Sequence, residues 1–355
     1  MKLDRYVIRE LIVPFLIGTL AVVLMFEANL LIALFKNLSL SGIPFSGILK
    51  LLLYKTPFFM NMTLPVGIAL ATSLAMARFT RESELTAMRA AGASILRVML
   101  PISLFGIAVG VGNFYLAEDL MPRAEKAATK LQNELTLLGG APDFKANVHV
   151  TLGDYSVDIK TLSRRSDGSL QLDDVVLIQR PRTYEVGVYL AKTGLYDKGV
   201  WTFKNANAWY FKDDSLYQFQ SKEMTIFQRI NINDIYSQSQ PTEMSIGELS
   251  AAIQSGKQQK NDTTMLQVTY HTRFSVPAAC YVFAIAGPVF AIWLGRGGGF
   301  MGVLLSILMV MLWYNVFIIS TEIFGRNGWL NPLLAAWMPN ILFFVLAVFG
   351  LRRLE

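Results

Sequence analysis

The segment RFTRESELTAMRAAGAS, Arg78–Ser94, places five charged side chains between two of the most apolar stretches of the chain. Thr80 is a favoured N-cap residue, and two glutamates follow in the next turn, where the helix dipole stabilises anions. Gly92 is typical of a helix C-terminus. The segment therefore predicts a short helix over residues 81–91.

The predicted helix has an apolar face and a charged face, because positions three and four apart lie on the same side of a helix. The apolar face consists of Leu85, Met88, Ala91 and Ile95, and the charged row consists of Arg78, Glu82 and Arg89. An apolar face of this kind needs a partner surface to cover it.

Composition indicates an integral membrane protein. The chain has 355 residues, of which 53% are hydrophobic and 16% charged, and its mean hydropathy is +0.40; soluble domains carry about a quarter charged residues. The net charge of +6 does not indicate nucleic-acid binding, because the basic residues are scattered over loops and form no stripe with interleaved aromatics. The single cysteine, Cys280, excludes an internal disulfide.

Six apolar runs are each long enough, or nearly so, to cross a bilayer, which takes about 20 residues. They cover residues 10–35, 48–77, 96–118, 272–295, 300–322 and 332–351. The basic residues of the short loops fall on one side of the predicted membrane, and the positive-inside rule makes that side cytoplasmic. We therefore expect both termini, and the segment 78–94, in the cytoplasm.

Residues 147–230, between the third and fourth runs, alternate apolar and polar side chains and are divided by Gly, Asp, Asn and Pro turns. Many short strands with one buried face predict a sandwich or jelly roll. Alternation places Trp201 and Phe203 on one face, and Trp209 and Phe211 repeat the pattern in what we expect to be the next strand. The topology places this domain outside the cytoplasm.

The predicted fold is a polytopic α-helical membrane protein with six transmembrane helices and an inserted all-β, jelly-roll-like extracytoplasmic domain. Its expected parts are three spans in 1–120, a connector in 121–145, the β domain in 146–240, a connecting helix and linker in 241–270, and three spans in 271–355. Ser245 and Glu248 form a capping box at the start of the connecting helix.

No catalytic motif is present in the sequence. The two histidines, His149 and His271, belong to no metal-binding or Ser/His/Asp pattern. The glycine-rich stretch GRGGGF, residues 295–300, lacks the Lys and Ser/Thr of a phosphate-binding loop and joins two apolar runs. We expect no catalytic residue, metal or cofactor on this chain, so an ATP-driven function requires an ATPase on another chain.

Three stretches together carry a family resemblance: ELTAMRAAGAS (84–94), HTRFSVPAACYVFAIAGPVFAI (271–292) and WLNPLLAAWMPNILFF (329–344). The chain resembles the lipopolysaccharide export permease family of LptF and LptG over essentially its whole length. The resemblance implies a heterodimer of two related permeases in the bacterial inner membrane, with two copies of a cytoplasmic ABC ATPase that binds ATP and magnesium. It further implies that lipopolysaccharide is extracted from the outer leaflet and passed through the periplasmic β domain to a jelly-roll bridge protein.

In this light the segment 78–94 is expected to be the coupling helix that contacts the ATPase. The expected contact residues are Arg78, Glu82, Glu84, Leu85, Met88 and Arg89. Leu85 and Met88 would fill apolar pockets on the ATPase, and the charged residues would fix the register. The alternative is a helix whose apolar face lies on the bilayer interface.

Four basic residues at the predicted outer ends of the spans are candidates for binding the lipid A phosphates, because the positive-inside rule disfavours cations there. They are Lys36, Lys50, Lys55 and Arg273. The alternatives are snorkelling and structural pairing. For Lys55, the structural alternative is pairing with Glu27 of the first span, which lies at a similar depth.

The family further implies an apolar cavity for acyl chains, formed where spans one, two and five face the partner subunit. Candidate lining residues are Phe26, Leu30, Phe317 and Ile318; the alternative for each is an ordinary core or lipid-facing position. Two other functions remain open. One is a permease of the same architecture for another glycolipid, and the other is a mechanotransmission or periplasmic interaction protein that moves no lipid.

Overall fold

The computed structural model describes residues 2–37, 45–138, 145–152, 155–164, 169–179, 186–197, 200–212, 215–227, 240–258, 262–293 and 298–354. These residues fall into two compact units, one helical and one containing a β-sheet, and each is described separately.

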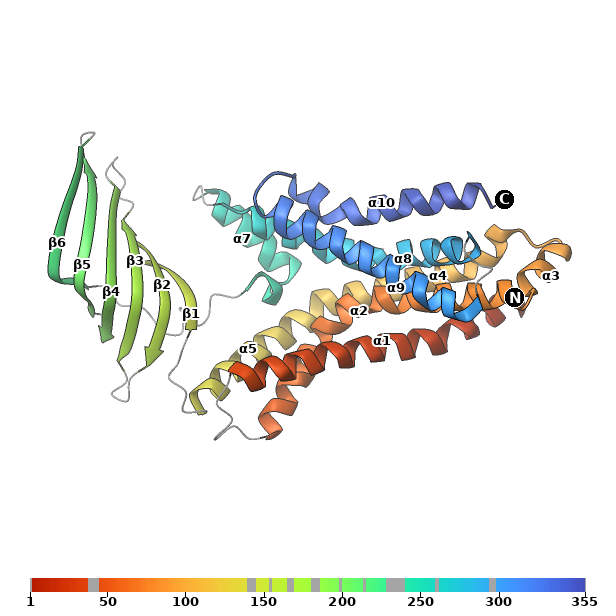
Figure 1. Cartoon of the computed structure of the whole chain (residues 1–355), viewed down its shortest axis with the longest axis horizontal. Helices are drawn as coiled ribbons and strands as arrows, with labels where there is room; N and C mark the ends of the chain where they lie inside the picture. The colour runs from red at the N-terminus through yellow and green to blue at the C-terminus, as the bar shows by residue number, and fades with distance from the viewer. Residues whose placement is uncertain are drawn as a thin grey trace. The chain divides into compact units, whose positions relative to one another are not determined.

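Long helices dominate the helical unit (Figure 1). Their bounds are α1 Lys2–Asn37, α2 Phe45–Arg81, α3 Glu84–Ala90, α4 Ile95–Tyr115, η1 Leu116–Leu120, α5 Met121–Leu138, η2 Pro241–Glu243, α7 Ile246–Gln258, α8 Thr264–Trp293, α9 Gly298–Ile318, η3 Ile319–Gly325 and α10 Pro332–Arg352. Six helical segments are long and apolar enough to cross a membrane: Lys2–Phe35, Phe45–Arg81, Ile95–Gln132, Thr264–Trp293, Leu304–Gly325 and Pro332–Arg352. The described part of the chain therefore confirms six helices that are able to span a membrane, as the apolar runs predict.

The third span differs from its expected bounds. The helix continues from α4 through the π-helical turn η1 into α5, so most of the expected connector 121–145 is helical as far as Leu138. Its sequence, MPRAEKAATKLQNELTLL, is rich in Ala, Leu, Lys and Glu, which are strong helix formers. The apolar run ends near residue 118, but the residues that follow it still favour a helix.

The centre of the helical unit is α8, of whose apolar window 78% is buried, against 56% or less in the other spans. Small residues let neighbouring helices approach it closely, as is usual in membranes. A Cβ on Gly287 of α8 would lie 2.2 Å from the Thr72 hydroxyl of α2, and one on Gly106 of α4 would lie 2.4 Å from the Cβ of Ala284. These contacts fix α2 and α4 against α8.

The described residues of the β unit form six antiparallel strands in sequential order (Figure 1). They are β1 Lys145–Leu152, β2 Tyr155–Arg164, β3 Leu170–Gln179, β4 Val186–Asp197, β5 Val200–Lys212 and β6 Ser215–Phe227. A jelly roll instead contains Greek-key connections between non-sequential strands. The described strands thus form an antiparallel meander, and the expected jelly-roll order is not found among them.

The sheet is creased where its alternation slips by one residue. Buried positions are three apart at Leu172 and Val175 of β3, and again at Phe203 and Ala206 of β5. One intervening residue in each strand has a positive φ, 49° for Asp174 and 51° for Asn205. Asp and Asn tolerate this left-handed conformation better than most residues. The residues at the crease are in register across four strands: Asp173, Thr193, Lys204 and Glu223.

The crease corrects one prediction about the strands. Trp201 and Phe203 share the buried face, both with 0% exposure, as alternation predicts. The slip at Asn205 then brings Ala206 and Ala208 onto that face, so Trp209, which was expected to repeat the pattern in a further strand, instead lies in β5 with the opposite parity. The side chain of Phe211 lies outside the described part.

Candidate functional site

The charged segment 78–94 begins differently from its prediction. Helix α2 continues through Thr80 to Arg81, and the Thr80 hydroxyl donates to the Met76 carbonyl at 2.9 Å inside that helix. The predicted N-cap is therefore wrong. The chain instead turns at Ser83, whose backbone is left-handed with φ 59°, and the separate helix α3 starts at Glu84. The predicted C-terminal end is confirmed, because Gly92 adopts φ +89° and donates to the Arg89 carbonyl at 2.9 Å.

The apolar face of α3 points into its own chain. Leu85 is 6% exposed and belongs to the core of the helical unit, and Met88 packs against the same core. The expectation that these two side chains fill pockets on a partner is therefore corrected for Leu85, which the chain itself covers, whereas Met88 is covered only in part. The exposed side of α3 instead presents Thr86, Ala87, Arg89 and Ala90.

A cluster of hydrogen bonds and ion pairs ties this segment to α1. The Arg78 guanidinium pairs with Glu10 and donates to the Tyr6 hydroxyl at 2.9 Å. It also reaches Glu82 at 3.3 Å and Glu84 at 3.5 Å. The Tyr6 hydroxyl in turn donates to Glu84 at 2.8 Å. Sequence patterns near residue 80 could not reveal Tyr6 and Glu10, which lie about 70 positions earlier.

Glu82 lies at the exposed edge of this cluster. A side-chain hydrogen bond from Arg81, with Arg78 nearby, lowers the pKa of the Glu82 carboxyl below its ordinary value. Hydrogen bonding to the charged form favours ionisation. Glu82 therefore presents a negative charge at neutral pH beside the exposed face of α3.

Arg273 is a structural residue in this conformation. The residue is 5% exposed, and its guanidinium donates to the carbonyls of Ala117 at 2.7 Å, Thr242 at 2.8 Å and Met244 at 2.8 Å. These bonds join α8 to the π-helical turn η1 and to the chain around η2. The expectation that Arg273 binds a lipid head group is corrected, because backbone carbonyls occupy its terminal nitrogens.

Lys55 pairs with a different acid from the one expected. Its ammonium lies 2.5 Å from the carboxylate of Glu125 on α5, and Glu125 is 4% exposed. Glu27 instead accepts a hydrogen bond from the Thr56 hydroxyl at 2.7 Å. The expected pair with Glu27 is thus corrected, because α5 extends the third span far enough to bring Glu125 beside α2.

The other two head-group candidates differ in what the structure shows. Lys50 is exposed on α2. The side chain of Lys36, near the end of α1, lies outside the described part. Lys50 is therefore the described candidate whose side chain is open to its surroundings.

The four expected cavity residues lie on two helices. Phe26 stacks on Phe59 of α2 with ring centroids 5.6 Å apart, and Leu30 follows one turn later, half-buried. Phe317 stacks on Trp313 within α9 at 5.2 Å, and Ile318 is 44% exposed. Of these four side chains Ile318 is the exposed one, and the other three are partly buried.

Sequence patterns did not identify an apolar groove of about 340 Å³ between α4 and α8. Its lining includes Gly106, Gly110, Phe114, Tyr115, Phe274 and Tyr281. The available signal was the four-residue spacing of Gly106 and Gly110, which is typical of closely packed membrane helices.

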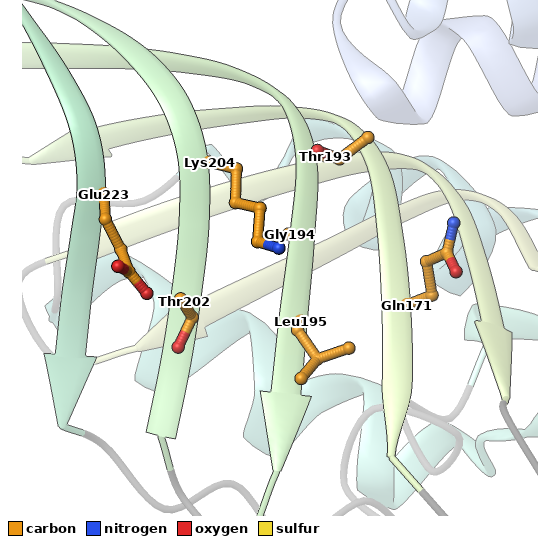
Figure 2. A pocket seen from close by; sticks show the side chains of 7 residues that line it. All are labelled: Gln171, Thr193, Gly194, Leu195, Thr202, Lys204 and Glu223. Atoms are coloured by element: carbon orange, nitrogen blue, oxygen red, sulfur yellow. The ribbon is translucent and has the colours of Figure 1, made fainter.

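The β unit carries a depression of about 450 Å³ beside the crease, with several polar side chains in its lining (Figure 2). Gln171, Leu195 and Thr202 line it together with the crease residues Thr193, Lys204 and Glu223. Lys204 and Glu223 project from neighbouring strands β5 and β6 in Figure 2 and are paired in register. This face of the sheet is polar, whereas the aromatic side chains Trp201 and Phe203 lie on the opposite face.

The chain, with its helical unit and inserted β-sheet, was compared with known protein families. The family model described as lipopolysaccharide export system permease LptF/LptG matches residues 5–353. The chain belongs to the LptF/LptG permease family. A comparison with curated proteins found no match. Membership of the LptF/LptG family implies a permease of lipopolysaccharide export, and the six helices agree with a membrane protein of this family.

Proposed function

We propose that this chain is the permease subunit of an ATP-driven lipopolysaccharide exporter in the bacterial inner membrane. It works beside a related permease and two copies of a cytoplasmic ABC ATPase, which hold the ATP and magnesium, and it is not itself an enzyme. The observation that carries the proposal is the family match over residues 5–353, which includes the six spans and the β unit.

The ATPase contact is proposed on the exposed side of α3. Thr86, Ala87 and Ala90 offer a small, flat surface, and Arg89 with the ionised Glu82 supplies charges that set the register. The buried Leu85 holds α3 against the helical unit, so a force applied to the exposed side reaches the spans through a packed contact.

Lipid binding is proposed at the outer ends of α1 and α2, where Lys36 and Lys50 remain the head-group candidates. The β unit is proposed to lie in the periplasm and to pass lipid onward by strand addition to a jelly-roll bridge. Edge strand β6 supports this role, because Leu216, Tyr217 and Phe219 are 65%, 56% and 49% exposed. An exposed apolar edge of this kind is suited to pairing with another chain.

The test is affinity purification of the full chain in mild detergent, followed by mass spectrometry of bound proteins and lipids. The proposal expects a related permease, an ABC ATPase and lipopolysaccharide. If a different glycolipid co-purifies with the same protein partners, the result would support the alternative function, a permease of the same architecture for another glycolipid. Periplasmic partners without an ATPase or bound lipid would support the interaction protein instead.

A further inference from the structure

We infer that Tyr6 and Arg78 clamp the cytoplasmic end of α1 to α3, so that the two helices move as one rigid body when the ATPase acts on α3. The inference rests on the proposed coupling role of α3 and adds the route by which its motion enters the membrane. Tyr6 and Arg78 are positioning residues in this account.

The geometry of the cluster supports a clamp rather than a single pair. Tyr6 joins two groups at once, donating to Glu84 of α3 at 2.8 Å and accepting from Arg78 of α2 at 2.9 Å. Arg78 holds Glu10 of α1 as well as Glu84, so α1 and α3 are linked both directly and through α2. Contacts that share members over-determine the arrangement, and losing one weakens the others.

Packing and partial burial strengthen these bonds. The Tyr6 ring lies 5.8 Å from the ring of Phe79, which is 0% exposed. The carboxylates of Glu10 and Glu84 are 27% and 28% exposed, and Arg78 is 35% exposed. Charges held partly away from water interact more strongly than a fully exposed pair. A second tie, from Arg97 to Asp4 at 2.5 Å, fixes the same end of α1 to α4.

The consequence is mechanical. Force is carried between sites by packed side chains and hydrogen-bond networks attached to rigid elements. Helix α1 runs without a break from Lys2 to Asn37. Displacement of α3 therefore moves the cytoplasmic end of α1, and the helix continues from there past Pro14 to Phe26.

The first experiment measures lipopolysaccharide transported per ATP hydrolysed by the reconstituted full complex. Tyr6→Phe keeps the ring and removes the hydroxyl, and we expect a fall of about tenfold, the fold-change for losing one hydrogen bond to a charged group. Tyr115→Phe, on an exposed tyrosine of α4, is the matched control and should leave the ratio unchanged. Arg78→Lys should behave like Tyr6→Phe, whereas Arg326→Lys, on an exposed arginine outside this cluster, should not.

The second experiment measures distance directly between spin labels at Arg5→Cys on α1 and Ala91→Cys at the C-terminal end of α3, two exposed positions outside the proposed ATPase contact. The native Cys280 is buried and does not compete for the label. One narrow distance that is the same in nucleotide-free and ATP-trapped complexes is expected, and a broadened distance is expected in Tyr6→Phe.

A label distance that changes between the nucleotide states, or a wild-type transport ratio in Tyr6→Phe, would overturn the clamp. If wild-type complex itself transports no lipid with ATP, the proposed function fails instead. The two failures are thus distinguished by the wild-type measurement.

Discussion

At the residue scale, Arg273 shows how a basic side chain at a span end can serve the fold. Its guanidinium donates hydrogen bonds to backbone carbonyls of η1, of η2 and of the residue that follows η2. The carbonyl of Ala117 lies within the π-helical turn, which is a common place for a helix to accept an outside donor.

Replacing Arg273 by Ala leaves these buried carbonyls without their donor. We expect the detergent-solubilised protein to lose about 3 kcal/mol or more of stability, measured by thermal unfolding. Arg326→Ala is the matched control, because Arg326 is exposed and pairs only weakly with Glu322 at 3.5 Å. Equal melting temperatures for the two variants would show that Arg273 is not structural.

A second residue-scale prediction concerns pH. Hydrogen bonds from Lys126 and from the Ser245 backbone N–H lower the pKa of the Glu248 carboxyl. A carboxyl whose pKa is lowered in the folded state adds stability above its unfolded pKa and loses it as the pH falls through the folded pKa. The attachment of α7 to α5 should therefore weaken in acid, below the ordinary glutamate range.

Hydrogen exchange of the first turn of α7 measures this effect. Protection of these amides, corrected for intrinsic exchange, should fall between neutral and acidic pH in the wild-type chain. Glu248→Gln should show the weaker protection at both pH values. An unchanged wild-type profile would contradict the assigned pair.

At the element scale, α3 has one side buried in the helical unit and one exposed side, which is the proposed ATPase contact. Ala87→Trp places a bulky side chain on the exposed side without disturbing the core. We expect loss of ATPase co-purification with an unchanged melting temperature, because a misfit at a packed interface costs about several kcal/mol of binding. Ala108→Trp, at an exposed position of α4, is the control. Full ATPase recovery with Ala87→Trp would place the contact elsewhere.

The elements also show what sequence could and could not predict. The six spans and the antiparallel strands follow from hydrophobic periodicity, which is a local property. Leu85 was predicted to contact a partner, whereas it packs inside its own chain. Amphipathicity identifies the apolar face of a helix but does not tell whether the same chain or another one covers that face. Thr80 was expected as a cap, although the preceding helix could also continue through it.

Pairings between distant segments were the second feature that the sequence could not predict. Lys55 meets Glu125 and not Glu27 because α5 extends the third span, which the apolar pattern did not reveal. The slip at Asn205 moved Trp209 off the expected face, since strict alternation assumes that no residue adopts a positive φ. Both errors concern single backbone features that redirect several side chains.

At the scale of the whole molecule, the helical unit and the β unit have separable tasks in the proposed exporter. Deleting residues 147–230 should leave a complex that still assembles and hydrolyses ATP, because the coupling segment and the core of the helical unit lie outside the deletion. Transfer of lipid to the bridge should be lost. Continued delivery by the truncated complex would show that the β unit does not carry the lipid.

The central claim is tested by reconstituting the full chain, its related permease and the ATPase in proteoliposomes loaded with lipopolysaccharide, and measuring transfer to a soluble jelly-roll bridge protein. Transfer should require ATP and should stop when the ATPase is inactivated. ATP hydrolysis without any transfer of lipopolysaccharide, in a complex that contains all these components, would contradict it.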